Sequence, residues 1–160
     1  MRKGLVDSMV LMHYDNAHEG AVEWWEGKVE DGWKVYISEV SLMERLKGVA
    51  GLSGSREAYL KAFRFRIQQM KKERKICRIL PVTRDICRKA RLLLEQYCKN
   101  FTPSPKRGRM EALICDMFIA ATALKYDLIL FTQNLKDFEW IDALNVEEAD
   151  YEIQEEGEAP

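Results

Sequence analysis

The sequence predicts an α/β fold, a three-layer α/β/α sandwich around a central, mostly parallel sheet of four to five strands. Short apolar runs such as WKVYI alternate along the chain with longer helical segments, which is typical of βαβ units. The runs are continuously apolar, as expected of strands that are covered on both faces. At 160 residues the chain is long enough for one domain with its own core.

The elements are predicted from apolar runs and their flanking residues. We expect strands at residues 3–6, 33–37, 76–80, 128–131 and 144–146. We expect helices at residues 9–27, 38–46, 55–74, 83–97 and 110–125. Ser38, Ser55 and Thr83 are suitable N-caps for three of these helices. Residues 1–146 therefore form the predicted domain, and the acidic stretch 147–160 is predicted to be a flexible tail.

Charge is distributed unevenly, although the formal net charge is only −1. Between residues 61 and 91 there are 12 bases and 2 acids, and after Lys136 every charged side chain is acidic. The basic segment favours a polyanion such as nucleic acid as a partner, or else it consists of solvated helix faces.

The cysteines and the apolar runs indicate the compartment. The four cysteines lie in apolar-periodic stretches without a C-x-x-C pair, which predicts reduced thiols in or near the core of a cytoplasmic protein. No apolar run approaches the roughly 20 residues needed to span a membrane, so no membrane partner is expected.

Several polar side chains share a position at the carboxyl ends of the predicted strands or in the helices beside them. They are Asp7, Glu44, Asp116, Thr132, Asn134 and Asp137. In a parallel sheet such positions can converge at one edge. Carboxylates brought together repel one another, so a cation is needed to make the cluster tolerable at neutral pH. Oxygen ligands suit Mg²⁺ or Mn²⁺, which can activate water and stabilise a phosphodiester transition state.

Each candidate also has a purely structural interpretation. Asp7 could cap the first helix, and Glu44 could face solvent. Asp116 could cap an apolar helix, although the apolar residues before it favour a position inside the helix. Asn134 and Asp137 could be turn formers. These separate interpretations do not explain why all the candidates fall at corresponding ends of elements.

Four segments, in order, resemble the motifs of the PIN domain, the metal-dependent ribonuclease fold of VapC-type toxins. The first motif, a strand that delivers an Asp followed by Ser or Thr, is matched by GLVDSMVLM. The second, which supplies Glu44 and not Glu39, is matched by ISEVSLMERLKG, and a strand-Pro-helix segment is matched by RILPVTRDICRKA. The most specific motif is matched by DMFIAATALKYDLILFTQNLKDFEWI. The resemblance runs from Leu5 to Val146.

The resemblance implies an Mg²⁺- or Mn²⁺-dependent endoribonuclease that leaves a 5′-phosphate and a 3′-hydroxyl. The implied catalytic residues are Asp7, Glu44, Asp116 and Asn134. The implied metal ligands are Asp7, Glu44, Asp116 and Asp137, with Ser8 and Thr132 orienting the cluster. It also implies an RNA substrate, a homodimer and a cognate antitoxin protein that blocks the acidic pocket.

Two positions depart from the family's pattern. Met9 stands where Asn or Ser is common, and Asn134 stands where many members carry a fourth acid. These departures keep open a second hypothesis, a PIN-like module that binds RNA or protein without turnover. A third hypothesis, an aspartyl-phosphate enzyme built on Asp7, requires a second Asp at the position of Met9.

Two further features are left without a catalytic role. His13 and His18 form no triad with Ser or Cys and are predicted to be exposed or half-buried. The long helix predicted after Ser55 is a candidate surface for a dimer or a partner. Phe63 and Phe65 in that helix are compatible either with packing or with a partner groove.

Overall fold

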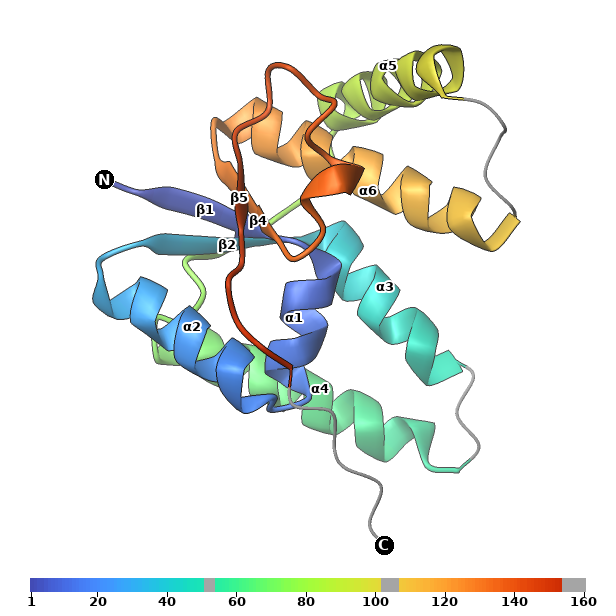
Figure 1. The fold of residues 1–160 in the computed structure, drawn as a ribbon. Coiled ribbons are helices and arrows are strands. Elements are labelled where there is room, and N and C mark those ends of the chain that lie inside the picture. Colours follow the sequence, from blue (N-terminus) through green and yellow to red (C-terminus); the bar gives the residue numbers. More distant parts are fainter. Residues whose placement is uncertain (51–53, 102–106, 154–160) are drawn as a thin grey trace, which may run out of the picture.

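The computed structural model describes residues 1–50, 54–101 and 107–153, and a five-stranded parallel sheet lies at its centre (Figure 1). The strands are β1 (Lys3–Val6), β2 (Lys34–Ser38), β3 (Arg78–Leu80), β4 (Ile129–Thr132) and β5 (Val146–Glu148). Their order is β3-β2-β1-β4-β5, and every pairing is parallel. The chain moves outward from β1 to β3 and then returns to β4 beside β1. The strand order therefore reverses between β1 and β4, where ligands bind in folds of this kind.

Helices cover both faces of the sheet, which confirms the predicted three-layer sandwich. They are α1 (Ser8–Asp15), α2 (Glu19–Glu30), α3 (Glu39–Ala50), α4 (Arg56–Lys72), α5 (Arg84–Asn100), α6 (Arg107–Tyr126) and a short 3₁₀ helix η1 (Leu135–Asp137). One core joins α5 and α6 to the sheet, and a second core joins α1, α2 and α4 to the opposite face. Leu5 and Val6, adjacent on β1, lie in different cores because successive strand residues point to opposite faces. Figure 1 shows α3 beside the carboxyl ends of the strands.

The prediction of one helix over residues 9–27 is wrong, because this segment forms α1 and the start of α2. Ala17 has a φ of 58°, in the left-handed region that ends a helical run. The amide groups of Asn16 and Ala17 close the end of α1 on Met12 and Tyr14. Neither Gly nor Pro marks the break, so the sequence carried no strong signal for it.

The predicted boundary of the tail also lies too early in the chain. Strand β5 extends the sheet beyond residue 146, and Ala149 is only 1% exposed. The amide group of Ala149 donates to the carbonyl of Thr132, and Nε2 of Gln133 donates to the carbonyl of Tyr151 at 2.9 Å. Backbone pairing therefore holds this acidic segment in place despite its polar composition. Residues 154–160 of the predicted tail lie outside the described part of the chain.

His13 is buried instead of exposed or half-buried. Its Nδ1 lies 2.9 Å from the hydroxyl of Tyr151, and its ring lies edge-on to that of His18. Burial lowers the pKa of His13, and His18 lowers it further. This histidine therefore joins α1 to the C-terminal segment.

The cysteine prediction is correct in part. All four cysteines are free, but Cys77, Cys87 and Cys98 are exposed and only Cys115 is half-buried. Helix α5 buries a narrow stripe that includes Ile86, and Cys87 falls beside this stripe because adjacent helical residues point about 100° apart. The position of a cysteine in an apolar stretch of sequence was therefore a weak predictor of its burial.

The basic segment is divided between two sides of the molecule. Helix α4 packs against one face of the sheet and α5 against the other, as Figure 1 shows. Some of the bases are also occupied, since Arg66 pairs with Asp15 at 2.6 Å and Lys75 pairs with Glu26 at 2.7 Å. The segment does not form one continuous basic face. In the described ranges, no helix has the length and apolar character required to cross a membrane.

Candidate active site

Asp7 lies at the point where β1 ends and α1 begins. Its amide group donates to the carbonyl of Phe131 at 3.0 Å, which ties this residue to the neighbouring strand β4. Its Oδ1 accepts from the amide group of Val10 at 2.8 Å, so the residue does cap α1. Its Oδ2 accepts from Oγ1 of Thr132 at 2.5 Å, and the whole residue is only 6% exposed. The cap and the site therefore use different oxygens of one carboxylate.

Thr132 links Asp7 to the loop that follows β4. Its side chain is fully buried, and its Oγ1 accepts from the amide group of Asn134 at 3.0 Å. The Nδ2 of Asn134 in turn donates to Oδ2 of Asp137 at 2.6 Å. A continuous run of hydrogen bonds thus connects four of the predicted residues along this edge of the sheet.

Glu44 reaches the same edge from α3. Its carboxylate accepts a hydrogen bond from the hydroxyl of Ser8, the first residue of α1. The next residue, Arg45, donates from Nε to Oδ2 of Asp15 at 2.9 Å and so holds α3 against α1. Glu44 is half-buried, and its carboxylate is held by Ser8 instead of being left to solvent alone.

Asp116 lies in the middle of α6 and does not cap it. Burial raises the pKa of Asp116 from 3.8 to about 8, with further contributions from the carboxylates of Asp137, Glu44 and Asp7. No hydrogen bond from a described residue offsets these effects. The structure therefore brings the four predicted carboxylates within electrostatic range of one another.

Burial also raises the pKa values of two other acids of this cluster, Asp7 and Asp137. Burial raises the pKa of Asp7 to about 6, although hydrogen bonds from Thr132 and from backbone amide groups oppose the shift, and Glu44 adds to it. Burial also raises the pKa of Asp137, against the hydrogen bond from Asn134. Such a cluster is stabilised either by protons or by a cation.

The donor set suits a hard divalent cation, although the ligands are not drawn together into a cage. Within the described residues, no three side chains of His, Cys, Asp or Glu form a ready-made metal site. The facing groups are nevertheless carboxylates that repel one another, and Mg²⁺ and Mn²⁺ prefer oxygen ligands of this kind. The chemistry of these residues therefore fits such an ion.

Two residues beside the cluster were not anticipated from the sequence. Burial raises the pKa of the Cys115 thiol to about 11, and the neighbouring Glu44 contributes. Burial also raises the pKa of Tyr151, and the carboxylate of Asp7 contributes. Cys115 could have been found as the neighbour of Asp116, but Tyr151 lies in the acidic stretch that was predicted to be a tail.

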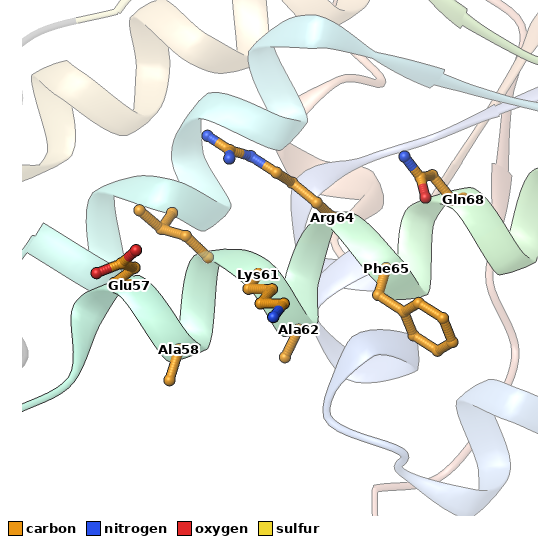
Figure 2. A pocket seen from close by; sticks show the side chains of 8 residues that line it. Glu57, Ala58, Lys61, Ala62, Arg64, Phe65 and Gln68 are labelled. Atoms are coloured by element: carbon orange, nitrogen blue, oxygen red, sulfur yellow. The ribbon is translucent and has the colours of Figure 1, made fainter.

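A broad depression of about 1010 Å³ lies away from this cluster, along the outer face of α4 (Figure 2). Ala58, Ala62 and Phe65 line it at helical spacing, and Phe65 is 60% exposed. Phe63 points into the core and is only 4% exposed, which settles its role as packing. The face of α4 thus stays a candidate partner surface, separate from the acidic site.

Comparison with known proteins connects this arrangement to one family. The PIN domain family matches residues 5–144. The search of curated proteins returns no match. Solved structures with a similar fold include VapBC2 from Rickettsia felis bound to a promoter DNA fragment (17% identity, 92% of this chain and 99% of that chain covered, TM-score 0.69). DNA-bound VapBC from Salmonella typhimurium is also similar (20% identity, 94% and 100% covered, TM-score 0.67).

A third similar structure is FitAcB from Neisseria gonorrhoeae (22% identity, 89% and 94% covered, TM-score 0.63). At these identities the likenesses show a shared fold. The family match covers the site described above, from the strand that precedes Asp7 to the loop that follows Thr132. The chain belongs to the PIN domain family.

Proposed function

We propose that the protein is a metal-dependent endoribonuclease that hydrolyses RNA phosphodiester bonds as the toxin of a toxin–antitoxin pair. The observation that carries the proposal is the cluster of carboxylates in which the pKa of Asp116 is raised to about 8. Membership of the PIN domain family supports it, because nucleases are common in that family. One structure of similar fold is described as a toxin–antitoxin complex, from Klebsiella pneumoniae, and another as a member of the VapBC family of toxin–antitoxin systems, from Mycobacterium tuberculosis.

Four side chains would hold Mg²⁺ or Mn²⁺. They are Asp7, Glu44, Asp116 and Asp137. Such an ion supplies positive charge for the phosphodiester and a more acidic water molecule. Without a cation, these carboxylates would repel the phosphate of RNA, so the same residues would also exclude substrate from the metal-free protein.

The remaining site residues orient this set. Thr132 holds one oxygen of Asp7, and Ser8 holds the carboxylate of Glu44. Asn134 holds Asp137 through its amide nitrogen and thereby places a carboxylate where the family often carries a fourth acid. We assign Asn134 a catalytic role through this contact, and its side-chain oxygen can still act as an acceptor.

The proposed partners are an antitoxin protein and a second copy of this chain. The proposed location is the cytoplasm, which contains both RNA and the antitoxin. A cognate antitoxin would cover the acidic cluster with a cationic side chain, since one cation can stabilise several carboxylates whose pKa values are raised. A homodimer is proposed as well. Co-expression with the protein encoded by an adjoining small gene should abolish toxicity, and the absence of any such gene would count against the toxin role.

A cleavage assay tests the proposed activity. The protein is incubated with mixed RNA and Mg²⁺ or Mn²⁺, with EDTA as one control. Asp116→Asn is the test variant, and Asp142→Asn, at an exposed acid outside the cluster, is the matched control. Cleavage should need metal, disappear in Asp116→Asn and persist in Asp142→Asn. Metal-independent cleavage, or full activity of Asp116→Asn, would contradict the assignment.

A second candidate function is an RNA- or protein-binding module with weak or no turnover. Met9, which is 49% exposed beside the cluster, and Asn134 favour it, because neither supplies a carboxylate. RNA binding without cleavage, unchanged by Asp116→Asn, would support the module and reject the nuclease.

A further inference from the structure

An ion pair joins the two helices that carry Glu44 and Asp116. Lys47 lies one turn beyond Glu44 on α3, and its Nζ pairs with the carboxylate of Glu111 on α6. The two side chains are 70% and 61% exposed, so the pair lies on the surface at the edge of the acidic cluster.

Lys47 is in electrostatic range of the cluster. Glu111 is the main cause of its raised pKa, and Cys115 and Glu44 contribute as well. Like any lysine, Lys47 is cationic at neutral pH. Lys47 also acts on the Cys115 thiol, whose raised pKa it lowers, so this cation lies beside residues of both helices that border the cluster.

Lys47 is suited to leave Glu111 and bind another anion. Exposed ion pairs add little to stability, and a lysine has a long flexible side chain with three donors. Arg45, two positions earlier, differs in this respect, because its partner Asp15 is only 5% exposed and also binds Arg66. The buried network holds α3 in place, which leaves the Lys47 pair without an essential structural role.

Exposed apolar side chains lie on the same stripes of the two helices. Met43, one turn before Lys47 on α3, is 63% exposed, and Ile114, three residues after Glu111 on α6, is 38% exposed. Exposed apolar and cationic groups together can hold unstacked bases and phosphates of single-stranded RNA. These side chains lie on the same two helices that carry Glu44 and Asp116.

We propose that Lys47 binds a phosphate of single-stranded RNA next to the one held at the acidic cluster, and that Glu111 holds Lys47 until RNA arrives. Met43 and Ile114 contact the base on this side. The inference rests on the proposed nuclease function and names a substrate-binding residue of that site. Glu111 acts as a competitor, because its carboxylate and the phosphate oxygens accept from the same ammonium group.

Binding is measured by fluorescence anisotropy with a labelled single-stranded RNA oligonucleotide and Mg²⁺, in the Asp116→Asn background so that no cleavage occurs. Lys47→Met should weaken binding by about tenfold, the loss expected for one charge-assisted contact. It should also reduce the slope of log affinity against log salt by about 0.7. Lys125→Met, which removes another ion-paired lysine at the far end of α6, should change neither quantity as much.

The proposed release of Lys47 from Glu111 is tested separately, by measuring the RNA affinity of Glu111→Gln. Glu111→Gln should tighten binding by about threefold, because a larger fraction of Lys47 is then free to bind. This gain should vanish when Lys47→Met is present as well. Glu95→Gln, at an exposed acid paired with Arg91 on α5, controls for the loss of one negative charge.

The inference is overturned if Lys47→Met binds RNA like Lys125→Met, or if the Glu111→Gln gain persists in the double variant. Failure of RNA binding by the Asp116→Asn protein itself would overturn it too. In the cleavage assay, Lys47→Met should raise KM with little change in kcat. Absence of cleavage by the unsubstituted protein would reject the proposed nuclease, whereas the binding comparison would still decide the role of Lys47.

Discussion

Asp116→Asn should make the metal-free protein more stable at alkaline pH. The folded protein raises the pKa of Asp116 from 3.8 to about 8, chiefly by burial. The unfolded chain therefore loses this proton near pH 4, whereas the folded chain keeps it until about pH 8. Because the folded state binds more protons between these values, its free energy of unfolding falls as the pH rises through them. Asparagine has no proton to lose and removes this penalty.

The size of the effect follows from the pKa of Asp116. Each pKa unit corresponds to about 1.4 kcal/mol, so the rise to about 8 sets an upper limit of about 6 kcal/mol above that pH. Solvent screening at the half-buried site reduces this, and we expect a gain of about 2 kcal/mol for Asp116→Asn at about pH 9 relative to about pH 5.

Urea unfolding in EDTA, followed by tryptophan fluorescence, measures this gain. Burial lowers the pKa of His13, which costs stability as the pH falls, but this effect is common to both proteins and cancels in the comparison. Asp142→Asn serves as the exposed control. Added Mg²⁺ should stabilise the unsubstituted protein at about pH 9 and stabilise Asp116→Asn much less. Equal stability of the two proteins at both pH values would refute the reasoning.

Three further substitutions probe the support of the site. Thr132→Val removes the hydroxyl that lowers the pKa of Asp7, so that pKa should rise above about 6 in an NMR titration and stability should fall by about 2 kcal/mol in urea. Gly20→Ala would place a Cβ 2.5 Å from the carbonyl oxygen of Glu152. This clash should displace the C-terminal segment from α2, so glutamyl endopeptidase should cut the segment faster. Tyr151→Phe removes the hydroxyl that contacts the buried histidine of α1 and should cost about 1 kcal/mol of unfolding free energy, whereas an unchanged urea midpoint would show that the contact adds nothing.

Much of the fold, and the clustering of most residues of the candidate site, could be predicted from the sequence. Asp116 was recognisable because a carboxylate inside the apolar stretch that forms α6 needs a cation or a proton to offset the cost of its burial. Asp7 was recognisable at the end of a short apolar run. The choice of Glu44 over Glu39 depended on the resemblance to PIN domains, and Glu39 instead lies exposed near the amide group of Val82, at 3.3 Å.

Other features could not be predicted because they depend on contacts between distant parts of the chain. The break at Ala17 has no Gly or Pro signal, and the C-terminal segment is acidic although the backbone pairing of β5 holds it. The division of the basic segment between α4 and α5 follows from which face of the sheet each helix covers.

The sequence by itself determined the layers and the carboxylates, because apolar periodicity and strand ends are local properties. Only the tertiary structure decided how these groups act on one another. Burial is the main cause of the raised pKa of Asp116, and Asp137, Glu44 and Asp7 add to it from η1, from α3 and from the turn after β1. The pairing of Lys47 with Glu111, which are 64 residues apart, likewise exists only where α3 meets α6. Burial and Coulomb interaction depend on distance in space, and that distance is set by the packing of the sheet and its helices.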